Sequence, residues 1–126
     1  MIKYLLDTNI CIYLMYEQPE QVIARFKQCR KGEVAISAIT WAELTCGLDT
    51  HNDESQFDGL LSAIAVAPFD IKAAAMFGKL SQQFPNRKSS FNRMIAAHAL
   101  ALKVTLVTNN VADFDIYGLA LENWAV

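Results

Sequence analysis

Short apolar runs alternate with helical patterns along most of this chain, and that alternation limits the folds it can form. The predicted strands cover Tyr4–Leu6, Val34–Ser37, residues 104–107 and, as a last short strand, residues 119–121. Strands that alternate with helices form parallel βαβ units, which place helices on both faces of one sheet. We therefore predict an α/β fold, a three-layer α/β/α sandwich with a mostly parallel central sheet.

Helices are predicted where apolar residues recur at helical spacing behind capping residues. The predicted helical segments cover residues 9–15, 19–30, 40–48, 57–64, 71–84 and 91–102. We expect Thr8 to cap the first of them and Pro19 to lie in the first turn of the second. Asp70 and Ser90 are expected to cap the last two.

The chain has the length and composition of one ordinary domain. It has 126 residues, of which 53% are hydrophobic, and it shows no repeat or linker, so residues 1–126 are expected to form a single domain. A chain of this kind buries a core without disulfides. Cys11, Cys29 and Cys46 are odd in number and lack CxxC spacing, which argues against disulfides and against zinc. Each is expected to pack as a small apolar residue.

No segment has the pattern of a signal peptide or a membrane span. Asp7 interrupts the first apolar run early, and the longest apolar runs fall short of the roughly 20 residues that cross a bilayer. We therefore expect a cytoplasmic protein.

The net charge of −2 is unusual for a nucleic-acid binder. Metal-binding acids would explain it, because bound cations offset their charge. The basic residues form two groups, one at Arg25, Lys27, Arg30 and Lys31 and one at Arg87, Lys88 and Arg93. We expect the first group to be a solvated surface and the second to contact phosphate.

Polar residues follow or precede the predicted strands at positions that should converge. Asp7 ends the first strand, and Glu43 lies one turn into the helix after the second. Asn92 lies in the first turn of the helix before the third strand, and Asn110 and Asp113 follow that strand. Functional residues of parallel sheets gather just past the carboxyl ends of the strands. We therefore treat these residues as one candidate site.

Oxygen ligands of this kind suit Mg²⁺ or Mn²⁺. An acid such as Asp7 at the end of a buried strand is costly unless it is paired or metal-bound. In two-metal nucleases the ions activate water and stabilise the leaving oxygen. Taken alone, each acid has a simpler explanation as a helix cap or a surface residue.

Four segments together carry a family resemblance, and they appear in the family's order and spacing over nearly the whole chain. They are MIKYLLDTNICIYL, SAITWAEL, FNRMIAAHAL and LVTNNVADF. The chain resembles PIN-domain toxins of the VapC type. The resemblance implies a PIN domain and a metal-dependent endoribonuclease of a type II toxin–antitoxin pair. It also implies structured RNA, often transfer RNA, as substrate and a VapB-type antitoxin as partner.

The resemblance assigns roles residue by residue. Asp7 and Glu43 match the family's first two acids, which bind metal and act in catalysis. Thr8 and Asn9 match the adjoining polar residues, where Asn9 is expected to orient Asp7.

The fourth segment is less clear. Thr108 matches the hydroxyl that supports this segment, and Asp113 is its nearest acid and the expected fourth ligand. Asn110 stands at a position that is itself acidic in many PIN domains.

Asn92 is the main departure from the family pattern. The third segment of the family normally reads F-D-x-x-I-A-A-H, and here Asn92 replaces the Asp. An amide oxygen still contacts a cation but brings no charge, so metal binding and activity should fall by about 10²-fold or more. The amide is either an introduced inactivating substitution or a natural difference.

Residues near the third segment have further expected roles. Ser89, Ser90 and Arg93 are expected to position the phosphate of RNA. His98 shares a helix face with apolar residues and is expected to be packed and hydrogen-bonded rather than a ligand.

Two other functions stay open. The chain could be a catalytically silent domain that binds RNA or antitoxin, or an α/β phosphatase or DNA nuclease that uses the same acids. The helical segments 9–15, 19–30 and 40–48 carry more apolar surface than a small sheet covers. We therefore expect a homodimer, and an antitoxin whose C-terminal segment lies in a groove near the acids.

Overall fold

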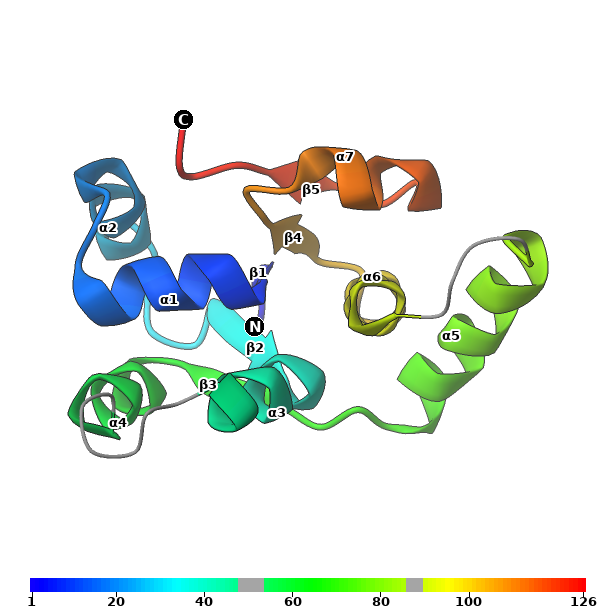
Figure 1. Cartoon of the computed structure of the whole chain (residues 1–126), viewed down its shortest axis with the longest axis horizontal. Coiled ribbons are helices and arrows are strands. Elements are labelled where there is room, and N and C mark those ends of the chain that lie inside the picture. Colours follow the sequence, from blue (N-terminus) through cyan, green and yellow to red (C-terminus); the bar gives the residue numbers. More distant parts are fainter. Residues whose placement is uncertain (48–53, 86–89) are drawn as a thin grey trace.

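The computed structural model describes residues 1–47, 54–85 and 90–126, and its centre is a five-stranded sheet (Figure 1). Neighbouring strands are parallel and follow the order β3-β2-β1-β4-β5. The strands are β1 (Tyr4–Leu6), β2 (Val34–Ser37), β3 (Ala65–Ala67), β4 (Thr105–Val107) and β5 (Leu121–Glu122). The predicted α/β class is confirmed.

Helices cover both faces of this sheet, as a three-layer sandwich requires. They are α1 (Thr8–Tyr16), α2 (Glu20–Lys27), α3 (Ala38–Gly47), α4 (Glu54–Ala63), α5 (Ile71–Gln83), α6 (Phe91–Leu102), α7 (Val111–Phe114) and the 3₁₀ helix η1 (Asp115–Tyr117). Figure 1 shows α1, α2 and α4 on one side of the sheet and α5 and α6 on the other. Within the described ranges, no helix is long and apolar enough to cross a bilayer.

The central strands divide the core into two clusters because successive side chains point to opposite faces. Leu6 and Ile36 pack with the helices α1, α2 and α4 in one cluster. Leu5 and Leu106 pack with α5 and α6 in the other. Both faces of β1 and β2 are therefore buried, which explains why these strands are continuous apolar runs.

Asp7, not Thr8, caps α1. The Asp7 carboxylate accepts a 3.0 Å hydrogen bond from the Ile10 backbone N–H, and Thr8 is the first helical residue. Aspartate caps helices at least as well as threonine. Our expectation for Thr8 is therefore wrong, and its hydroxyl is available for another partner.

Other predictions are confirmed with small shifts. Asp70 caps α5 and Ser90 caps α6, as expected. Pro19 lies one residue before α2 rather than in its first turn. Helix α3 begins two residues earlier than predicted, and its predicted end at residue 48 lies outside the described residues.

Two strands at the sheet edges differ from the prediction. Strand β3 was not predicted, because Ala65 and Val66 are exposed and alanine favours strands weakly. It forms because it pairs with β2. The last strand lies at Leu121–Glu122, where it pairs with β4, rather than at residues 119–121.

The cysteines are all free, as expected, but they do not all pack alike. Cys11 is buried and Cys29 is half-buried, whereas Cys46 is exposed near the end of α3. Our expectation of an apolar packing role is therefore wrong for Cys46.

Arg25 holds the C-terminal segment against α2 instead of lying on a solvated surface. Its Nη2 donates to the Tyr4 hydroxyl at 2.9 Å and lies 3.5 Å from Oε1 of Glu122. The guanidinium also lies 5.2 Å from the ring centre of Trp124, and the indole N–H of Trp124 donates to Glu122 at 3.0 Å. The expectation that the first basic group is only solvated is therefore wrong for Arg25.

Candidate active site

Asp7 is a buried carboxylate at the carboxyl end of the central strand β1. Only 5% of it is exposed, and its backbone N–H donates to the Val107 carbonyl at 2.9 Å. One carboxylate oxygen accepts from the Ile10 N–H and the other from the Thr108 hydroxyl. Burial raises the pKa of Asp7, although these hydrogen bonds oppose the shift. The site therefore holds a carboxylate that is partly satisfied and poorly solvated.

Thr108 supports Asp7 from the end of β4. Its side chain is fully buried, and its hydroxyl donates to Oδ2 of Asp7 at 2.5 Å. The same hydroxyl accepts from the Asn110 N–H at 2.9 Å, and the Thr108 N–H donates to the Glu122 carbonyl at 2.9 Å. The polar groups of Thr108 therefore fix the turn after β4 to both Asp7 and β5.

Glu43 joins the site from α3 through Thr8. The Thr8 hydroxyl donates to Oε1 of Glu43 at 2.9 Å, which connects residues 35 positions apart in the sequence. Repulsion by Glu43 is one of the causes that raise the pKa of Asp7. The two carboxylates therefore share one electrostatic environment, and Thr8 orients Glu43.

Asn9 contacts Asp7 through its backbone N–H. The Asn9 N–H lowers the pKa of Asp7 by hydrogen bonding, while the residue itself is exposed.

Asn92 and Asp113 lie on two other helices, α6 and α7. Asn92 is half-buried in the first turn of α6, and Asp113 is exposed in the short helix α7. No three acidic, histidine or cysteine side chains within residues 1–47, 54–85 and 90–126 form a group that could hold a metal ion. Asp113 is therefore not grouped with Asp7 and Glu43, and the segment after β4 contacts Asp7 through Thr108 instead.

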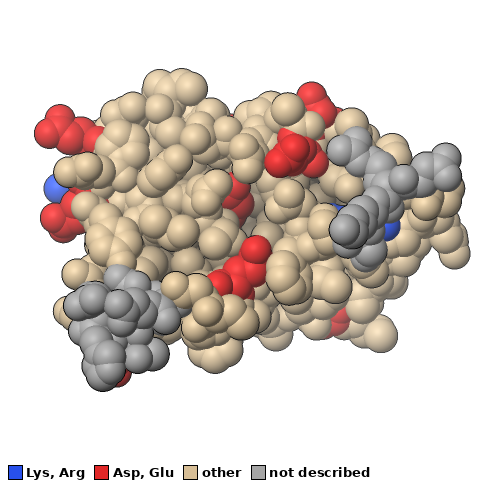
Figure 2. Space-filling model, in the orientation of Figure 1, with Lys and Arg blue, Asp and Glu red and all other residues tan. Residues whose placement is uncertain are grey.

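The donor set of Asp7 and Glu43 fits Mg²⁺. This ion binds through one or two carboxylates and keeps several waters, so a third acid is not required. Asp7 and Glu43 present hard oxygen donors, and their mutual repulsion disfavours the metal-free site. Figure 2 shows acidic side chains in the middle of one face of the molecule.

Arg93 is not available to bind RNA. Only 3% of it is exposed, and its guanidinium donates to the Ser81 hydroxyl and the Phe84 carbonyl, each at 3.2 Å. It therefore connects α6 to α5, and the expectation of a phosphate contact is wrong. The Ser90 hydroxyl accepts from the Arg93 N–H as a helix cap. Ser89 lies outside the described residues.

His98 is packed and hydrogen-bonded, as expected. It is 1% exposed, and its Nδ1 lies 2.7 Å from the Ser37 hydroxyl at the end of β2. The ring also makes an edge contact with Phe69. Burial lowers the pKa of His98, which favours the neutral ring. His98 thus ties α6 to β2 near the site.

One set of residues next to the site was not predicted. Asn109 donates to the Tyr13 hydroxyl at 3.0 Å and accepts from Asn123 at 3.1 Å. The two asparagines are 14 residues apart, and nothing in their local sequence indicates that they meet. Only the register of β4 and β5 brings them together.

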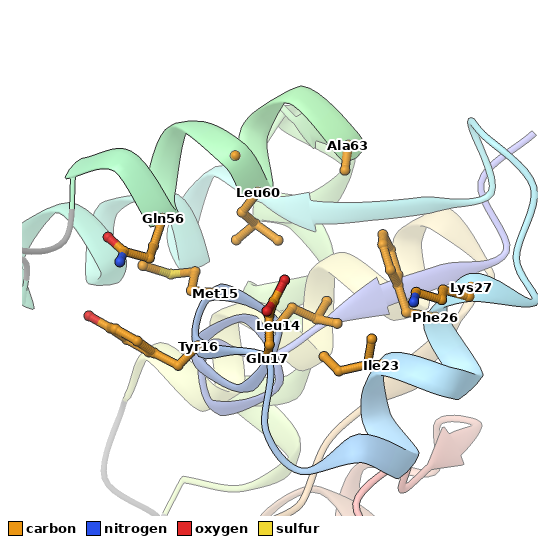
Figure 3. Close-up of a pocket in the computed structure, with 11 residues that line it drawn as sticks. Leu14, Met15, Tyr16, Glu17, Ile23, Phe26, Lys27, Gln56, Leu60 and Ala63 are labelled. Atoms are coloured by element: carbon orange, nitrogen blue, oxygen red, sulfur yellow. The ribbon is translucent and has the colours of Figure 1, made fainter.

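One hollow contains residues of the site, and a second hollow shares part of its lining. The larger, of about 610 Å³, lies between α1, α2 and α4 and has apolar walls that include Leu14, Ile23 and Leu60 (Figure 3). The smaller, of about 150 Å³, includes Thr8 and Glu43. Met15 and Tyr16 line both hollows, so the apolar surface continues up to the acids.

The family model of the PIN domain matches residues 4–118. The chain belongs to the PIN-domain family. It is 32% identical to the tRNA(fMet)-specific endonuclease VapC of Shigella flexneri, over 99% of this chain and 100% of that protein. It is 34% identical to Ribonuclease VapC2 of Rickettsia felis, over 96% of this chain and 97% of that protein. Within the PIN-domain family it is therefore a member of the VapC ribonucleases.

Solved structures of VapC complexes have the same fold. The DNA-bound VapBC complex from Salmonella typhimurium has a matching chain with a TM-score of 0.89 and 31% identity, covering 98% of this chain and 99% of that one. VapBC-1 from nontypeable Haemophilus influenzae gives a TM-score of 0.84 and 29% identity, with full coverage of both chains. The predicted PIN-domain fold is confirmed.

Proposed function

We propose that this VapC-family chain is built as a metal-dependent endoribonuclease that cuts structured RNA, with transfer RNA as the substrate class. The observation that carries the proposal is the pair of buried or half-buried carboxylates, Asp7 and Glu43, each held by a threonine hydroxyl. One relative is named as specific for tRNA(fMet). That name, together with the family membership, favours RNA over DNA or a phosphate monoester.

We propose Mg²⁺ or Mn²⁺ as the cofactor. Asp7 and Glu43 would hold the ion, with the amide oxygen of Asn92 as a neutral donor from α6. When bound, such an ion supplies an activated water and stabilises the oxygen that leaves the phosphodiester. Thr108 and Thr8 hold the two carboxylates in place, so the site needs little rearrangement.

In this proposal the amide of Asn92 lowers both the metal affinity and the rate of RNA cutting. An amide at this position removes one negative charge from the group that faces the ion. Metal affinity should therefore be weak in the chain as it stands and stronger after Asn92→Asp, a change that preserves side-chain shape. Titration calorimetry of both forms with Mn²⁺ tests this, and equal affinities would remove Asn92 from the metal site.

We further propose that a VapB-type antitoxin binds the apolar hollow between α1, α2 and α4 and extends towards Glu43. Three observations support it: the mainly apolar lining, the exposed Ile12 and Tyr16 on α1, and the relatives solved as VapBC complexes. Adding the cognate antitoxin should raise the mass measured by light scattering. Changing Ile23→Glu in the hollow should abolish that increase, whereas Lys103→Glu at a distant helix end should not.

The proposed nuclease is tested by cutting assays on labelled transfer RNAs and on single- and double-stranded DNA. The Asn92→Asp protein should cut RNA with Mn²⁺ and stop when EDTA is added. Asp7→Ala and Glu43→Ala should each abolish cutting, and their combination should cost little more, because the acids act as one unit. Tight RNA binding without any cutting would favour the silent RNA-binding domain, and cutting of DNA alone would reject the ribonuclease.

A further inference from the structure

We infer that Asn109, held between Tyr13 and Asn123, is a positioning residue for the turn that carries Thr108. This inference rests on the proposed function, because the turn matters through the Thr108 hydroxyl that contacts Asp7. It extends the site to the C-terminal segment.

The hydrogen bonds have one consistent direction. The Oδ1 of Asn123 accepts from the Ala125 N–H at 2.9 Å, which leaves its Nδ2 as the donor to Oδ1 of Asn109. The Nδ2 of Asn109 is then the donor to the Tyr13 hydroxyl. Both the oxygen and the nitrogen of the Asn109 side-chain amide are hydrogen-bonded, so the orientation of this side chain is fixed.

The chain of bonds joins α1 to the turn at a second point. The first point is Asp7, at the start of α1, which accepts from Thr108. The second is Tyr13, six residues further along α1, which accepts from Asn109. Two attachments on one helix fix both the distance and the rotation of the turn relative to Asp7, which a single hydrogen bond cannot do.

The C-terminal segment completes the arrangement. The Glu122 carbonyl accepts from the Thr108 N–H at 2.9 Å, and Asn123 follows it directly. The backbone of Glu122 therefore holds Thr108, and the side chain of Asn123 holds Asn109. Arg25 and Gln21 of α2 fasten the same segment elsewhere, through Glu122 and the Ala125 carbonyl, without touching the turn.

The test uses Tyr13→Phe, Asn109→Ala and Asn123→Ala in the Asn92→Asp protein, with Gln21→Ala as the matched control. Gln21→Ala removes a 2.9 Å bond to the same C-terminal segment but leaves residues 108–110 untouched. We expect the first three variants to bind Mn²⁺ roughly threefold more weakly. This loss is smaller than the tenfold or more that is typical when a group in direct contact with a metal-binding residue is removed. Gln21→Ala should leave Mn²⁺ affinity unchanged.

A double-mutant cycle identifies the bond between the two asparagines. Because Asn123 acts on the turn through Asn109, the double variant should bind Mn²⁺ no more weakly than Asn109→Ala alone. Independent structural damage would instead multiply the two losses. The inference is overturned if Asn123→Ala or Asn109→Ala lowers the melting temperature but keeps the Mn²⁺ affinity within twofold of the parent.

Amide hydrogen exchange gives a readout that needs neither metal nor RNA. The Asn110 N–H donates to the Thr108 hydroxyl, so it reports the order of the turn. Its exchange should accelerate in Asn109→Ala and stay unchanged in Gln21→Ala, and equal rates in all proteins overturn the inference. If the parent fails to bind Mn²⁺ or cut RNA while this amide responds as expected, the proposed function fails and the positioning role stands.

Discussion

The Thr108 hydroxyl donates a hydrogen bond to the Asp7 carboxylate across 101 positions of the sequence. This contact joins the ends of β1 and β4, which are neighbours in the sheet. It is one of three hydrogen bonds that lower the pKa of Asp7, together with those from the Ile10 and Asn9 N–H groups, but burial outweighs them and raises that pKa.

Asp7→Asn should stabilise the metal-free protein at neutral pH. The amide keeps an oxygen that caps α1 and removes a charge that burial disfavours. We expect the melting temperature to rise by a few degrees, the size that about 1 kcal/mol produces in a domain of this length. Saturating Mn²⁺ should raise the melting temperature of the parent but not of Asp7→Asn, because only the parent keeps the carboxylate.

The pH dependence of that stabilisation has a definite sign. The pKa of Asp7 is raised in the folded state, so folding is favoured while the group is protonated. This contribution is fully present below the unfolded pKa of 3.8 and is lost as pH rises through the folded pKa. The stability gap between Asp7→Asn and the parent should therefore close on acidification. A gap that widens below neutral pH, or an equal gap for the exposed control Asp58→Asn, would contradict the assignment.

Thr108→Val should destabilise the fold more than Thr108→Ser. Valine leaves both Asp7 and the Asn110 N–H without their hydroxyl partner in a buried place, which costs about 1–3 kcal/mol. Serine keeps the hydroxyl and loses only a methyl group. Urea unfolding measures both variants, and equal midpoints would show that the hydroxyl is not what Thr108 contributes.

Thr8→Val should weaken Mn²⁺ binding while leaving stability within about 0.5 kcal/mol, as is usual for positions outside the core. The Thr8 hydroxyl orients Glu43, and without it the carboxylate samples more rotamers. Thr45→Val on α3 is the matched control, because its hydroxyl contacts only a carbonyl of its own helix. If both substitutions change Mn²⁺ affinity alike, the effect is not specific to Glu43.

Arg25→Lys should destabilise the protein by about 1 kcal/mol without changing Mn²⁺ affinity. Lysine keeps the charge but lacks the planar guanidinium that bonds Tyr4 and lies near both Glu122 and the Trp124 ring. Chemical denaturation and calorimetry on the same variant separate the two properties. A loss of metal affinity here would show that the whole C-terminal segment, and not only Asn123, controls the site.

Burial on both faces explains why the central strands were predictable. Strands β1 and β2 have the bounds expected from their apolar runs. Asp7 and Glu43 were found because they stand at strand ends or just beyond. Strand β3 was missed because its residues are partly exposed and form a strand only by pairing with β2.

Side-chain partners far apart in sequence could not be predicted. The Thr8 hydroxyl donates to Glu43, 35 residues away, instead of capping α1. Arg93 follows a polar stretch of sequence and would be expected at the surface, but the packing of α6 on α5 buries it. Neighbouring residues give no sign of either outcome.

We propose that the Asp7–Glu43 site cuts RNA with a bound metal ion and that the amide at Asn92 limits the rate of cutting. The most direct test of this proposal is the rate at which the parent and Asn92→Asp cut the same labelled transfer RNA at equal, saturating Mn²⁺. We expect Asn92→Asp to cut faster by about 10²-fold or more, because it restores one charge at a catalytic site, and we expect EDTA to stop the cutting. Equal rates for the two proteins would contradict it.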